Sequence, residues 1–62
     1  MKKHELTCMM EDDDSIEFIT NGKKKVINVF VKVNSSEDYT NVVLNAREFL
    51  LMADKIREEL EL

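Results

Sequence analysis

Four short stretches along the first part of the chain have the character of strands: hydrophobic and polar residues alternate in the first two, and the last two are rich in β-branched residues. These stretches cover residues 4–10, 15–20, 24–33 and 39–44. Alternation with a period of two is typical of β-strands that bury one face. The third stretch is also the richest in valine and isoleucine, which favour strands. The pattern therefore predicts four strands.

Short polar segments separate these predicted strands. Residues 11–14 are all acidic, and residues 34–38 read NSSED. Asn21–Gly22 is the strongest hairpin signal, because a type I′ turn needs two positive φ angles, which Asn and Gly tolerate. A two-residue turn there would pair Thr20 with Lys23. Connections this short favour an antiparallel meander.

The hydrophobic spacing becomes helical after Asn45. This residue is a favourable N-cap, and Glu48 three residues later can complete a capping box. No Gly or Pro interrupts the segment from Ala46 to about Leu60. At about 100° per residue, its apolar residues form a stripe roughly 160° wide, as expected for a helix that lies on a sheet. The stripe consists of Ala46, Phe49, Leu50, Met52, Ala53, Ile56 and Leu60.

The chain is small enough that a second copy is expected to complete its core. Its 62 residues form one domain, residues 1–62, and a domain of about 60 residues buries only about 60% of its unfolded surface. Leu51 lies opposite the helical stripe, and this second apolar contact favours a homodimer formed through the helix. The predicted interface consists of Phe49, Leu51, Met52, Ile56 and Leu60. The predicted fold class is α+β, a four-stranded antiparallel sheet followed by one C-terminal helix.

The residue inventory argues against catalytic and metal chemistry. The chain has one cysteine, Cys8, so no intrachain disulfide forms and a reducing compartment fits best. His4 and Cys8 are too few ligands for zinc, and the acidic run Glu11–Asp14 lacks the glycine and interleaved ligands of a calcium loop. No serine or cysteine has the partners of an activated nucleophile. We therefore expect no enzyme, no metal and no cofactor.

Targeting signals are not evident in the sequence. The apolar runs are shorter than a signal-peptide core and far shorter than a membrane span. The expected location is the cytoplasm, without a membrane partner.

Charge is segregated along the chain, although the net charge is −4. Residues 15–36 carry four lysines against Glu17, which gives this segment a sum of +3. Side chains alternate between the two faces of a strand, so part of this basic segment falls on the sheet face opposite the core. That open face is predicted to carry Lys24, Asn28, Phe30, Lys32 and Tyr39.

A sheet face of this composition suits single-stranded nucleic acid. Bases stack on aromatic rings, while lysines contact the phosphates. The alternative interpretation is a solvated face whose lysines keep an edge soluble and whose Phe30 is covered by a dimer partner.

The segment from Ser15 to Leu60 resembles the positive cofactor four family of transcriptional coactivators, with its bacterial and phage relatives. The resemblance lies in a lysine-rich hairpin tip that leads into a long strand (GKKKVINVFVKV) and in a short strand that runs into a helix (VVLNAREF). It implies a homodimer of ββββα subunits that binds single-stranded or unwound DNA with little sequence preference. It also implies a role in transcription, replication or recombination, with proteins of these processes as partners.

The resemblance assigns nucleic-acid contacts by position. The hairpin tip matches Lys23, Lys24 and Lys25, and the exposed basic and aromatic stretch matches Phe30 with Lys32. With the open face included, the predicted nucleic-acid-binding residues are Lys23, Lys24, Lys25, Asn28, Phe30, Lys32 and Tyr39. The chain departs from eukaryotic members in its short acidic NSSED loop, its lack of a Ser- and Lys-rich tail and its negative charge. These departures imply weaker, salt-dependent binding and a bacterial or phage origin.

Two other hypotheses stand beside this one. In the second hypothesis, the chain is an acidic protein-interaction module or a phage-encoded regulator. Its acidic helix and residues 11–14 then contact a basic surface on a host protein. The third hypothesis is a metal-dependent enzyme, which requires a bound divalent ion.

Overall fold

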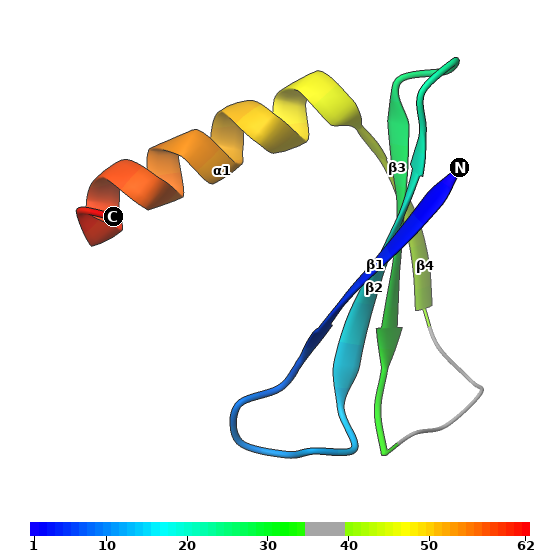
Figure 1. Cartoon of the computed structure of the whole chain (residues 1–62), viewed down its shortest axis with the longest axis vertical. Coiled ribbons are helices and arrows are strands. Elements are labelled where there is room, and N and C mark those ends of the chain that lie inside the picture. The colour runs from blue at the N-terminus through cyan, green and yellow to red at the C-terminus, as the bar shows by residue number, and fades with distance from the viewer. Residues whose placement is uncertain (35–39) are drawn as a thin grey trace.

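The protein is an antiparallel four-stranded sheet followed by a helix. The computed structural model describes residues 1–34 and 40–62. The elements are β1 (Lys2–Thr7), β2 (Ser15–Asn21), β3 (Val26–Lys32), β4 (Thr40–Asn45) and α1 (Ala46–Leu60). Each strand pairs with the next along the chain, so the sheet is a meander in the order β1-β2-β3-β4 (Figure 1). The predicted ββββα fold class is confirmed. Within the described residues, no helix is long and apolar enough to cross a membrane.

The hairpin between β2 and β3 differs from the predicted two-residue turn. Asn21 pairs with Val26, which leaves Gly22–Lys25 as a four-residue connection. The Asn21 carbonyl accepts the Lys25 N–H at 2.9 Å, and Asn21 Oδ1 accepts the N–H groups of Lys23 and Lys24 at 3.1 Å each. The Asn21 side chain thus accepts hydrogen bonds from the backbone of the turn. The residue with a positive φ, of 57°, is Lys25. Lys24 therefore lies in the turn and not on the open face.

The sheet faces nevertheless follow the predicted alternation. Thr20 pairs with Ile27 instead of Lys23, and this shift of four residues is even. An even shift leaves the side chains that remain within β2 and β3 on their predicted faces. The core face carries Ile27 and Val29, which are 6% and 8% exposed.

The first strand is shorter and earlier than the predicted residues 4–10. It ends at Thr7, because the Cys8 N–H donates to the Asp14 carbonyl at 2.9 Å and closes a turn. Cys8 Sγ accepts the N–H groups of Met10 and Glu11 at 3.3 and 3.4 Å. Met10 is therefore an exposed loop residue and not part of the core face.

Helix α1 begins where the sequence predicts but does not lie along the sheet. Asn45 Oδ1 accepts the Glu48 N–H at 3.0 Å, which confirms the N-cap. The Phe49 ring contacts the Phe18 ring of β2 at a centroid distance of 5.5 Å. Beyond this first turn the helix extends away from the sheet (Figure 1), and none of its residues is buried. The physical reason is that β4 runs into α1 without a loop, so the strand end sets the helix direction.

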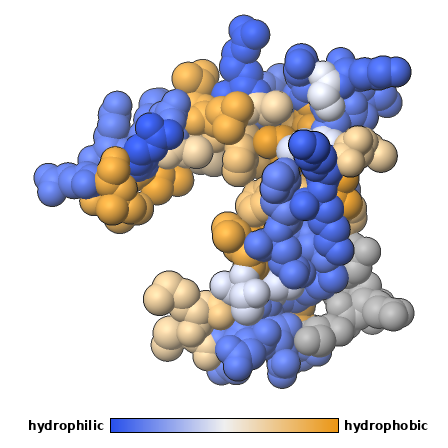
Figure 2. Space-filling model, viewed as in Figure 1, coloured by the Kyte–Doolittle hydropathy of each residue, from blue (hydrophilic) through white to orange (hydrophobic). Residues whose placement is uncertain are grey.

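The resulting shape exposes more surface than a compact chain of this size. The accessible surface is 5532 Å², against about 4,200 Å² expected for a folded monomer of this mass. The radius of gyration is 12.9 Å, against about 10.6 Å expected for a compact domain of this length. Hydrophobic side chains gather along α1 and where it meets the sheet (Figure 2). They include Leu50, Met52, Ile56 and Leu60 of α1.

Candidate nucleic-acid interface

The open face of the sheet consists of cross-strand rows that the register defines. One row runs from Lys3 through Ile19 and Asn28 to Val43. The next row runs from Glu5 through Glu17 and Phe30 to Asn41, and Lys32 follows opposite Ser15. The predicted residues Asn28, Phe30 and Lys32 therefore share one face, and each is half-buried. Tyr39 lies outside the described residues.

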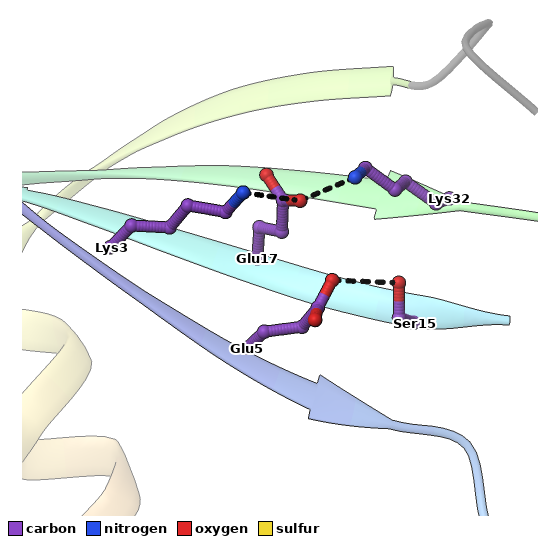
Figure 3. Close-up of polar contacts among 5 residues, drawn as sticks. All are labelled: Lys3, Glu5, Ser15, Glu17 and Lys32. Atoms are coloured by element: carbon purple, nitrogen blue, oxygen red, sulfur yellow. Dashed lines mark hydrogen bonds and ion pairs between the residues drawn. The ribbon is translucent and has the colours of Figure 1, made fainter. Parts of the chain in front are cut away.

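A buried carboxylate occupies the middle of this face. Glu17 is 5% exposed, and its Oε1 lies 2.5 Å from Lys32 Nζ and 3.3 Å from Lys3 Nζ (Figure 3). The three residues come from three adjacent strands, and both ammonium groups approach the same oxygen, which solvent does not reach. Beside them, Glu5 Oε2 accepts the Ser15 hydroxyl at 3.4 Å. Two lysines and two glutamates therefore leave the face without net charge.

The lysines also determine how Glu17 titrates. The hydrogen bond from Lys32 is the largest cause that lowers the pKa of Glu17 below its ordinary value, and Lys3 lowers it further. Burial acts in the opposite direction, but the hydrogen bonds and charges of the two lysines outweigh it. Glu17 is therefore ionised at neutral pH and holds both lysines.

A second group of cations gathers where the β2–β3 hairpin turns. The turn residues are exposed, and the start of β1 lies beside them, because Lys2 pairs with Thr20 and Lys3 with Ile19. The start of α1 is also attached here, since the Ala46 N–H donates to the Lys25 carbonyl at 3.0 Å. We define the hairpin end as Lys2, Lys3, Lys23, Lys24, Lys25 and Arg47.

The hairpin end also borders an apolar depression. Lys25 and Arg47 line a hollow of about 330 Å³ together with Ala46, Leu50, Leu51 and Asp54 of α1. Three residues of the hairpin end, Lys2, Lys3 and Arg47, were not predicted from the sequence. They lie about twenty residues before and after the lysine triplet, and only strand register brings them beside it.

The opposite end of the sheet is acidic, and Asp14 there joins the β1–β2 loop to the segment after β3. The Asp14 N–H donates to the Glu11 carbonyl at 3.1 Å, and Asp14 Oδ1 accepts the Asn34 N–H at 2.8 Å. These bonds fasten the β1–β2 loop to the end of β3. Among the described residues, no group of three His, Cys, Asp or Glu side chains could hold a metal ion.

The residues predicted for a dimer interface divide into two groups. Phe49 contacts Phe18 within its own chain. The other four are exposed: Leu51, Met52, Ile56 and Leu60 have 58%, 53%, 47% and 61% of their surface accessible.

Comparison of the chain with protein-family models, curated proteins and solved structures finds no match. The resemblance to the positive cofactor four family accordingly stays a prediction.

Proposed function

We propose that the protein binds single-stranded DNA as a homodimer and acts on unwound DNA in replication, recombination or transcription. The observation that carries this proposal is the hairpin end, where six cations from β1, the hairpin turn and α1 come together in a protein of net charge −4. A cluster of this kind attracts phosphates locally and releases counterions when it binds them. The resemblance to the positive cofactor four family points to the same ligand.

The open face supplies the sequence-tolerant part of the contact. Phe30 offers a ring on which a base can stack, and Asn28 and Asn41 flank it with amide groups. Stacking on an aromatic side chain contributes about 1–3 kcal/mol per base without demanding a sequence. A strand bound by its phosphates at the hairpin end would reach this ring along β3.

The homodimer is proposed from the surface that the single chain leaves exposed. The accessible surface of 5532 Å² exceeds that of a compact monomer by about 1,300 Å². A typical specific interface buries about 800 Å² per partner. A second copy of the chain is the partner that is always present to cover this surface. In a two-fold symmetric dimer, its exposed helix contributes the same apolar residues. Burial of Leu51, Met52, Ile56 and Leu60 would complete the core that the single chain lacks.

Fluorescence polarisation with a labelled oligo-dT tests the proposal. The variant Lys23→Gln/Lys24→Gln removes two cations of the hairpin end and should weaken binding about tenfold at about 50 mM salt, with a salt slope lower by about 1.4. The matched control is Lys55→Glu, which changes the net charge by the same amount on an exposed part of α1. Absence of binding at tens of micromolar protein, or equal losses in both variants, contradicts the proposal.

The second candidate is a protein-interaction module that binds a basic host protein. The observation that favours it is the lack of net charge on the open face, where Glu17 and Glu5 offset both lysines. Affinity capture from nuclease-treated lysate separates the two candidates, because a protein partner survives the loss of nucleic acid. A partner retained by the wild type but lost when the acids at residues 11–14 are replaced by asparagine and glutamine would support this candidate.

A further inference from the structure

The two lysines of the open face are held by one carboxylate. Lys32 is the lysine that the sequence assigns to phosphate contact, yet its Nζ lies 2.5 Å from Glu17 Oε1. Lys3, which also belongs to the hairpin end, shares the same oxygen at 3.3 Å. A phosphate that approaches either ammonium group therefore meets a fixed negative charge beside it.

We infer that Glu17 is an internal competitor for nucleic-acid phosphates, which holds Lys3 and Lys32 and restrains the affinity of the open face. This inference rests on the proposed binding of DNA and concerns the regulation of the same surface. A lysine has three N–H donors, so it could contact a carboxylate and a phosphate together. The two anions repel each other at that distance, however, so the phosphate gains little while Glu17 stays ionised.

The hairpin turn is in a different situation. Within the described residues, no carboxylate forms an ion pair with Lys23, Lys24 or Lys25. These lysines are exposed and meet an incoming strand without a competitor. The strand therefore binds first at the hairpin turn, and its phosphates gain little from Lys32 while Glu17 stays ionised beside it.

The variant Glu17→Gln tests the inference in the oligo-dT titration. Glutamine keeps the length of the side chain and an oxygen that can accept from the lysines, but it carries no charge. If both lysines then contact phosphates, the salt slope becomes steeper by about 1.4. The gain in affinity over the wild type is then at least about sevenfold at about 50 mM salt and declines by about the same factor at about 200 mM.

Glu5→Gln is the matched control. Glu5 lies directly opposite Glu17 on the same face and carries the same charge, but its carboxylate contacts the Ser15 hydroxyl. A general effect of net charge would raise affinity equally in both variants, and that outcome overturns the inference. Replacement of Lys3 and Lys32 by glutamine should also abolish the gain from Glu17→Gln, and a gain that persists overturns it as well.

The outcomes distinguish this inference from the proposed function. If the wild type binds and Glu17→Gln binds no more tightly, the inference fails while the proposed function stands. If no variant binds at tens of micromolar protein, both fail. Circular dichroism checks the fold of Glu17→Gln, and Glu17→Thr, which suits a strand position, serves as a second uncharged variant with the same expected gain.

Discussion

Replacing Ile56 with lysine should separate the proposed dimer into single chains. Ile56 is 47% exposed in the single chain, and full burial of an isoleucine side chain contributes about 1.5–3 kcal/mol. About half of this, roughly 1 kcal/mol, is thus available when a second copy covers the residue. Two-fold symmetry doubles the loss to about 2 kcal/mol, which raises the dissociation constant about thirtyfold. An unpaired ammonium group in an apolar interface increases the loss further.

Sedimentation equilibrium from micromolar to hundred-micromolar concentrations measures this effect. The wild type should approach twice the chain mass of 7.3 kDa, while Ile56→Lys should stay near that mass over the same range. The control is Met9→Lys, since Met9 is 98% exposed in the β1–β2 loop and should leave association unchanged. A wild type that sediments as a single chain throughout, or an Ile56→Lys variant that dimerises as well as the wild type, refutes the reasoning.

Two further predictions concern stability. The folded-state pKa of Glu17 lies below its ordinary value because Lys32 on β3 and Lys3 on β1 face it, with Glu5 on the same sheet face. Its stabilising effect is therefore fully present above its unfolded pKa and is lost as pH falls through the folded one. Melting temperatures of the wild type and Glu17→Gln should accordingly converge on acidification below about pH 4. Asn45→Ala should lower the free energy of unfolding by about 1 kcal/mol through loss of the N-cap, whereas Asn45→Asp should retain it. Chemical denaturation measures the difference, and an Asn45→Asp variant as unstable as Asn45→Ala contradicts the assignment.

Local signals in the sequence predicted the elements of this fold well. Asn45 and Glu48 mark the start of α1 because an N-cap is an interaction over three residues, which the sequence contains in full. The two faces of the sheet follow from alternation alone. They were predicted correctly although the turn was not, because the error in strand register was an even number of residues. The turn itself was mispredicted because the Asn21 side chain accepts two backbone N–H groups, which a four-residue connection allows.

The position of α1 and the state of Lys32 could not be predicted in this way. Whether an apolar helix lies on its own sheet depends on the connection before it, and here β4 continues into α1 without one. The ion pair between Lys32 and Glu17 depends on the register of β2 against β3, in which Glu17 lies opposite Phe30. The predicted two-residue turn would have shifted this register by four residues. Asn28, Phe30 and Lys32 thus lie on the open face as predicted, but Glu5 and Glu17 offset the charge of its lysines.

The separation of charge within the molecule reconciles a basic surface with an acidic protein. The sheet places the hairpin end at one extreme and the acidic loop Glu11–Asp14 at the other, in a molecule whose longest dimension is 32 Å. The Debye length is about 8 Å at physiological ionic strength, so a strand at the hairpin end experiences little repulsion from the distant acids. At about 0.01 M salt the Debye length is about 30 Å, so the net charge of −4 would then oppose the approach of DNA. At physiological ionic strength, the proposed binding of DNA should therefore depend on the local surface more than on the net charge.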